Sequence, residues 1–198
     1  RQMVKEYAPK YYAGMPLGTS NDQGCGIRLG QSVGGKTDHM NRVTAWRFLN
    51  PPLAFAQGIV VNKHGKRFCN EMVYGATLGD AMCEDNEGKA YLILSAELFS
   101  ESKVQANKAL PFQRDMAKML MYFNAKKKAN LEDIAKVYNL SAENLILEVN
   151  KYNEAANLGV PCEFGKAAKD IKFLQGPFYI MDISIDSKLA PLTTLTLG

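Results

Sequence analysis

The sequence predicts an α+β fold in which a small sheet is covered by helices. Two short apolar runs, at 59–61 and 90–94, and an alternating run at 180–185 have the length and composition of strands. Apolar residues recur at helical spacing in three segments between the second and third runs, at 112–123, 131–138 and 145–156. With 198 residues, 46% of them hydrophobic, the chain can bury one good core, or a core and part of a second.

The stretch 58–74, GIVVNKHGKRFCNEMVY, organises the rest of the chain. Its β-branched run is followed by the turn signal Asn-Lys-His-Gly, in which Gly65 can adopt the positive φ that such a reversal often needs. After the turn the chain is expected to be extended again. It brings three polar side chains, Asn70, Glu71 and Tyr74, toward the surface that the hairpin covers. Taken alone, these residues describe a hairpin followed by a polar corner.

The N-terminal part is expected to be irregular at first and then to form one helix and one strand. Gly24, Gly26 and Gly30 resemble a dinucleotide fingerprint, but the last spacing is wrong and no strand precedes them. We therefore interpret these glycines as sites of close helix packing. Residues 42–48 form a candidate strand, and the Pro-Pro pair that follows Asn50 indicates a change of domain.

The later helices carry recognisable caps. Asn130 and Ser141 are expected to cap the second and third helices, and Gly159 to end the third. The first of the three later helices, at 112–123, carries an apolar stripe that we expect to lie in the core. It consists of Phe112, Met116, Met119, Leu120 and Phe123.

Composition excludes several function classes. The net charge of +4 is mild, and we expect the run Lys126–Lys128 to be a solvated loop, not a nucleic-acid site. No apolar run approaches the ~18–20 residues that span a membrane. The four cysteines are scattered and only two histidines are present, so no metal site is expected. Reduced cysteines fit a cytoplasmic protein, although a processed export signal stays open because the sequence begins at Arg1.

Three stretches resemble one family. The string GIVVNKHGKRF-x-NE is similar to the sequence that opens the capping domain of the fumarate reductase/succinate dehydrogenase-like flavoproteins, which include the 3-ketosteroid dehydrogenases. GCGIRLGQSVGG and the C-terminal TLTLG match that family in order. The resemblance implies the end of an FAD-binding segment at 1–50, a substrate-capping domain at 51–178, and a return strand toward the FAD-binding domain at 179–198.

The resemblance also implies a cofactor and partners. FAD would belong to the full-length parent, with Thr196, Leu197 and Gly198 as its contacts in this chain. The Rossmann-type segment and the last flavin-domain segment of the family are not in the sequence, so we expect this chain to be an inactive fragment that does not hold FAD by itself. Its expected partners are the remainder of the FAD-binding domain and a small-molecule substrate.

The resemblance favours one subfamily over another. Fumarate reductases carry an E-x-x-R pair just before the hairpin, where this sequence has Pro51 and Ala54, and a histidine where it has Leu195. Without those groups a site cannot clamp two carboxylates in the usual way. The pattern NE-x-x-Tyr instead resembles the 3-ketosteroid dehydrogenases, and this implies an apolar carbonyl compound as substrate.

The resemblance assigns roles to four side chains. Tyr74 is the candidate catalytic residue, since a neutral phenol can donate a hydrogen bond to a ketone in an apolar pocket. Asn70, Glu71 and Tyr179 are candidate substrate-binding residues. The alternative for Tyr74 is a structural ring beneath the hairpin. The alternatives for the whole chain are a fumarate reductase-type enzyme for another acid and a stand-alone binding module without cofactor.

Overall fold

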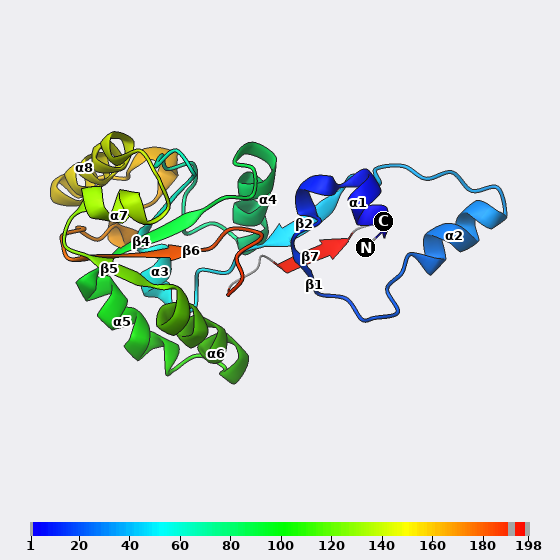
Figure 1. Ribbon diagram of the computed structural model, residues 1–198, viewed down its shortest axis with the longest axis horizontal. Coiled ribbons are helices and arrows are strands. Elements are labelled where there is room, and N and C mark those ends of the chain that lie inside the picture. Colours follow the sequence, from blue (N-terminus) through cyan, green and yellow to red (C-terminus); the bar gives the residue numbers. More distant parts are fainter. Residues whose placement is uncertain (1, 190–192, 197–198) are drawn as a thin grey trace.

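The computed structural model describes residues 2–189 and 193–196, and their strands form two sheets (Figure 1). The small sheet has the order β1–β7–β2 and consists of β1 (Met15–Pro16), β7 (Thr193–Thr196) and β2 (Val43–Trp46). The larger sheet has the order β3–β4–β6–β5 and consists of β3 (Ile59–Val61), β4 (Tyr91–Ser95), β6 (Phe178–Asp182) and β5 (Lys126–Lys128). All its pairings are antiparallel, and the predicted α+β fold is confirmed.

The helices cover both faces of the larger sheet, with α7 and α8 above it and α5 and α6 below it in Figure 1. The α-helices are α1 (Gln2–Tyr7), α2 (Cys25–Ser32), α3 (Leu53–Ala56), α4 (Gly75–Asp85), α5 (Ala96–Ala106), α6 (Pro111–Met119), α7 (Leu131–Val137) and α8 (Ala142–Leu158). Short 3₁₀ turns are η1 (Pro9–Tyr11), η3 (Glu163–Gly165) and η4 (Ala168–Asp170), and η2 (Leu120–Asn124) is π-helical. Residues 2–7 are therefore helical where an irregular lead-in was expected.

The core lies between the larger sheet and its helices. Strand β4 is buried along its whole length, and Ile93 is paired with Ile59 on one side and Ile180 on the other. The predicted pairing of the 58–74 hairpin with the strand at 90–94 is confirmed by this register. Gly65 has a φ of +75°, as the turn requires, while the restarted chain makes only one bridge, from Arg67 to Val61.

The predicted helix caps are also present. The Asn130 side chain accepts a hydrogen bond from the backbone N–H of Asp133 at 2.8 Å, and Ser141 accepts one from Asn144 at 3.3 Å. Gly159 ends α8 with a φ of +64°. These signals are local, so they could be found without knowledge of the tertiary fold.

Two further expectations were wrong. Phe112, Met119 and Phe123 are exposed, because α6 and η2 bury the opposite side of the helix. Lys126–Lys128 form the exposed edge strand β5 instead of a loop; lysines are common on such edges because they discourage further strand pairing. Helix α2 buries no residue among the described ones, so the close packing of its glycines stays a prediction.

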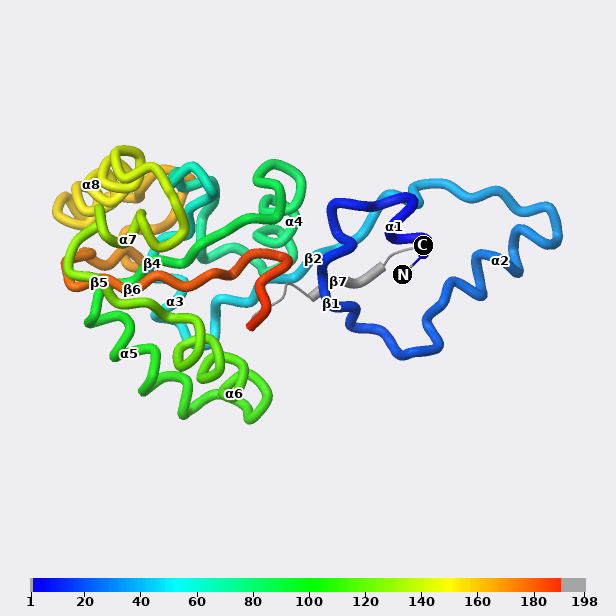
Figure 2. The backbone as a smooth tube through the Cα atoms, in the orientation of Figure 1, coloured from blue at the N-terminus to red at the C-terminus, as the bar shows by residue number. Residues whose placement is uncertain are grey.

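The chain passes between the two sheets twice, after β2 and after β6 (Figure 2). The buried Arg47 joins the two crossings, because its Nη2 donates to the carbonyl of Ser184 at 3.5 Å. Burial lowers the pKa of Arg47 to about 10, although the charge of Asp182 opposes the shift. Strand β6 continues past residue 178, so the larger sheet extends beyond that proposed boundary, and the domain bounds stay a prediction.

Candidate functional site

The candidate site lies where α4 meets β2, and two glycines bring these elements together. A Cβ on Gly79 would lie 2.0 Å from the carbonyl oxygen of Ala45, and one on Gly75 would lie 3.0 Å from that of Arg47. The backbone N–H of Arg47 donates to the Gly75 carbonyl at 3.0 Å. The helix therefore sits directly on the strand backbone, and this contact places the residue before α4, Tyr74, beside β2.

Tyr74 belongs to an aromatic cluster at this junction. Its ring packs edge-on against Trp46, with the ring centroids 5.2 Å apart, and Phe48 packs against the same indole at 5.3 Å. Tyr74 is 61% exposed, and Phe48 is also exposed. The cluster thus presents a phenol within an apolar surface, an arrangement suited to an apolar molecule with a carbonyl group.

Glu71 faces the opposite way and lies in a buried ion cluster. It is 1% exposed, and its carboxylate accepts hydrogen bonds from Nε and Nη2 of Arg67 at 3.0 and 2.9 Å and from Lys166 at 3.2 Å. It also accepts the backbone N–H of Val60 at 3.0 Å. Both oxygens are directed into the protein, so the geometry does not support the prediction that Glu71 binds substrate.

The ion cluster holds the corner at residues 70–74 from its buried side. Lys166 donates to the carbonyl of Gly58 at 2.8 Å, and both cations lie over the ring of Tyr152, 4.8 Å away for Lys166 and 5.0 Å for Arg67. Burial lowers the pKa of Lys166, although Glu71 opposes the shift. Burial also opposes the charged form of Arg67, but the attraction of Glu71 outweighs it and raises the pKa. The start of β3, the turn and the loop at 166 are therefore held together.

The other predicted site residues lie elsewhere. Asn70 closes a local turn, since its side chain accepts the backbone N–H of Met72 at 2.9 Å. Tyr179 stacks on Phe99 of α5 with 3.8 Å between ring centroids, whereas Tyr74 packs on β2, so these contacts do not bring the two tyrosines together. The backbone of Thr196 pairs with Val43 in the small sheet, and Leu197 and Gly198 lie outside the described residues.

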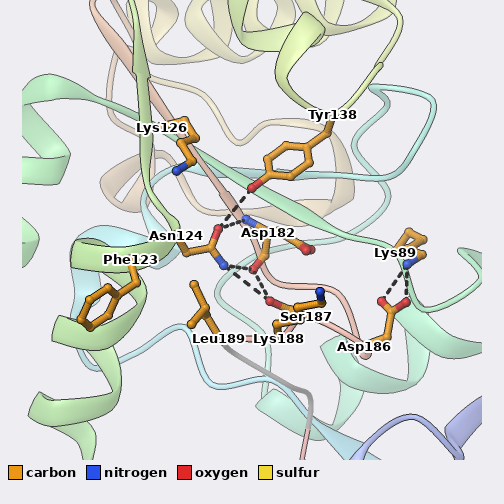
Figure 3. A pocket seen from close by; sticks show the side chains of 10 residues that line it. All are labelled: Lys89, Phe123, Asn124, Lys126, Tyr138, Asp182, Asp186, Ser187, Lys188 and Leu189. Atoms are coloured by element: carbon orange, nitrogen blue, oxygen red, sulfur yellow. Dashed lines mark hydrogen bonds and ion pairs between the residues drawn. The ribbon is translucent and has the colours of Figure 1, made fainter.

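A cavity of about 360 Å³ opens at the end of β6 (Figure 3). Asn124 of η2 bridges to this strand: its Nδ2 donates to the Asp182 carbonyl and its Oδ1 accepts the Asp182 N–H, both at 2.8 Å. The hydroxyl of Tyr138 donates to the same Oδ1 at 3.3 Å, and Lys89 pairs with Asp186 at 2.6 Å. These polar groups bond to one another. Their hydrogen bonds and the ion pair hold the chain that follows β6 in place.

The described residues offer no other reactive cluster. Within 2–189 and 193–196, no group of three or more His, Cys, Asp and Glu side chains is placed to hold a metal ion. Burial raises the pKa of the Cys83 thiol to about 12 and raises that of Cys69 further, so neither is a ready nucleophile. Over the same ranges, no helix is long and apolar enough to cross a membrane.

Sequence reasoning missed Trp46, Phe48 and Lys166. The aromatic pair stands at i and i+2 in a candidate strand, a spacing that puts two rings on one face and could have indicated the cluster. Lys166 lies 95 residues from Glu71, and no local pattern links them.

Comparison with known proteins finds relatives that match nearly the whole of this chain over part of their own length. It is 38% identical over 193 residues to a 3-oxo-5-alpha-steroid 4-dehydrogenase of Comamonas testosteroni, covering 96% of this chain and 36% of that protein. It is 22% identical to a fumarate reductase of Schizosaccharomyces pombe, covering 99% of this chain and 38% of that protein. The chain is homologous to part of these flavoproteins.

The fold agrees with that relationship. The crystal structure of a 3-ketosteroid-Δ4-(5α)-dehydrogenase from Rhodococcus jostii RHA1, solved with 4-androstene-3,17-dione, matches with a TM-score of 0.77 at 22% identity. That match covers 98% of this chain and 37% of the dehydrogenase. No family model matches the chain. The sequence thus spans little more than a third of the flavoprotein homologues.

Proposed function

We propose that this chain is the substrate-capping part of an FAD-dependent oxidoreductase that acts on a C–C bond next to a carbonyl, as in the 3-ketosteroid dehydrogenases. The observation that carries the proposal is the cluster of the half-buried Trp46 with the exposed Phe48 and Tyr74, in a chain homologous to a steroid dehydrogenase. The proposed division is a flavin-domain segment at 1–50, a cap at 51–178 and a return strand at 179–198. Thr196, Leu197 and Gly198 are proposed as flavin contacts.

The glycines at 24–30 do not support a dinucleotide site at α2. Gly24 precedes α2 in a left-handed conformation, but a loop and not a strand leads into that helix, so the strand–turn–helix that binds pyrophosphate is missing there. We therefore assign FAD, which would supply the redox chemistry, to the remainder of the parent, and we derive no step through it.

The role proposed for this chain is to bind and polarise the substrate. Trp46 and Phe48 offer aromatic surface to an apolar molecule, and the phenol of Tyr74 can donate a hydrogen bond to its carbonyl oxygen. The ion cluster under the corner supports this role, because it holds residues 67–71 from the buried side and leaves Tyr74 on the outside. A cap of this kind also excludes water from the reacting groups.

The charge at the corner disfavours the dicarboxylate alternative. Arg67, the first arginine after the hairpin turn, is buried and paired with Glu71. The exposed side chains of the aromatic cluster, Phe48 and Tyr74, carry no charge. A fumarate-type substrate would need exposed cations here, since two carboxylates must be neutralised as they leave water.

The test is Tyr74→Phe in the full-length parent, assayed with 3-ketosteroids. Loss of the hydroxyl should lower kcat by about 10²–10⁴-fold, the usual contribution of such a group, with an unchanged circular dichroism spectrum. Tyr7→Phe, at another exposed tyrosine, is the matched control and should keep full activity. Full turnover in Tyr74→Phe would make the tyrosine a packing residue and remove the site assignment.

A further inference from the structure

A segment of the cap that runs from the end of α5 to β5 combines exposed apolar rings with an excess of positive charge. Residues 103–128 carry one acidic residue, Asp115, and seven basic ones: Lys103, Lys108, Arg114, Lys118, Lys126, Lys127 and Lys128. The net charge of this segment, +6, exceeds the +4 of the whole chain. Asp115 is itself paired with Arg114 at 2.8 Å, and the exposed Glu101 precedes the segment on α5.

The same segment exposes large apolar side chains. They are Val104, Leu110, Phe112, Met119, Tyr122 and Phe123, and three of them, Phe112, Tyr122 and Phe123, are 70%, 79% and 64% exposed. Phe112 and Met119 are seven residues apart on α6, a spacing that puts both on one face. The buried side of α6 and η2 holds Ala117, Leu120 and Met121 instead.

We propose that this face, defined as residues 103–128, docks on the surface of an anionic lipid bilayer. A helix with aromatic and aliphatic side chains on one face and Lys or Arg beside them is the pattern of interfacial binding, in which rings enter the headgroup region. Lysine stems lie along apolar surface while their ammonium groups reach lipid phosphates. The proposal concerns binding at the membrane surface and does not depend on the role of Tyr74.

Charge decides between this occupant and the alternatives. An apolar face covered by another domain or a substrate needs no cations, whereas Lys103, Lys108 and Lys118, beside the exposed apolar side chains of α5 and α6, complement an anionic surface. Lys127 extends the basic surface, because its Nζ lies 5.8 Å from the ring of Tyr179, which stacks on Phe99 of α5, whereas Lys126 and Lys128 alternate to the other face of the sheet. Helix α6 also lies at the outer edge of the fold (Figure 1), where a flat surface can reach it.

The test is cosedimentation of the 198-residue chain and of its full-length parent with vesicles. Both should bind vesicles of phosphatidylglycerol and phosphatidylcholine, bind phosphatidylcholine alone much more weakly, and lose affinity at high salt. Phe112→Ser/Phe123→Ser should weaken binding by about tenfold or more, through the lost burial of two rings. Lys118→Gln and Lys127→Gln should each weaken it by about fivefold.

Leu147→Ser on α8 and Lys169→Gln on η4, both exposed and outside this face, are the matched controls and should bind like the wild type. The charge variants retain all apolar packing, so they keep the test valid if the double Phe variant fails to fold. Equal binding to neutral and anionic vesicles, wild-type binding by the charge variants, or binding by the fragment but not by the parent would each overturn the proposal. The last result would mean that the rest of the parent covers the face.

Discussion

Replacing Glu71 by Gln should destabilise the fold strongly, because it leaves two buried cations without their counter-charge. The carboxylate accepts four hydrogen bonds, from Val60, from two nitrogens of Arg67 and from Lys166. Gln has nearly the same shape and can still accept the Val60 N–H, so the main loss is charge. Breaking a buried ion pair by removing one partner costs about 3–5 kcal/mol.

Urea denaturation measures this loss directly, and thermal melting gives a second measure. For a chain of this length, about 3–5 kcal/mol corresponds to a melting temperature lowered by roughly 6–20 °C. Glu154→Gln, at an exposed glutamate of α8, is the matched control and should change stability by less than about 0.5 kcal/mol. A loss below about 1 kcal/mol for Glu71→Gln would refute the argument that the cluster fixes the corner.

A double mutant separates the charge effect from packing. Lys166→Met removes one of the two cations that Glu71 neutralises and keeps an apolar chain of similar length. If the cations are the source of the cost, Glu71→Gln should destabilise the Lys166→Met background by less than it destabilises the wild type. Equal costs in both backgrounds would show that Lys166 and Glu71 are not coupled.

Three further outcomes are expected. The pKa of Lys166 is lower in the folded state than its usual 10.5, so between the two values the unfolded state binds more protons and the free energy of unfolding should rise with pH. The urea midpoint should therefore increase with pH in this window, and it should not do so in Lys166→Met. Gly79→Ala should lower the melting temperature and disturb tryptophan fluorescence, since its Cβ would meet the Ala45 carbonyl; an unchanged melt would mean that α4 shifts freely on β2. A thiol reagent at neutral pH should label the exposed Cys25 quickly and the buried Cys83 only on unfolding, and fast labelling of Cys83 would contradict its burial.

The sequence by itself determined the local elements of this protein. The Gly65 turn, the caps at Asn130 and Ser141 and the end of α8 at Gly159 depend on residues within a few positions of one another. The apolar runs also specified β3, β4 and β6 of the larger sheet, because a fully buried strand such as β4 leaves few alternatives, but they gave no sign of the lysine strand β5. The motifs around the hairpin also indicated the resemblance to proteins that proved to be homologous to this chain.

Only the tertiary structure decided which faces are covered and which polar groups meet. The stripe on α6 has the spacing of a core helix, yet spacing cannot tell whether another element lies over it, and here none of the described residues buries Phe112. Glu71 and Tyr74 are three positions apart and looked alike as site candidates. Glu71 points into the protein because Lys166, distant in sequence, neutralises it there. Tyr74 lies at the surface of β2 because Gly75 and Gly79 allow α4 to pack on that strand. Burial of a charge depends on a partner, and the partner's position is a property of the whole fold.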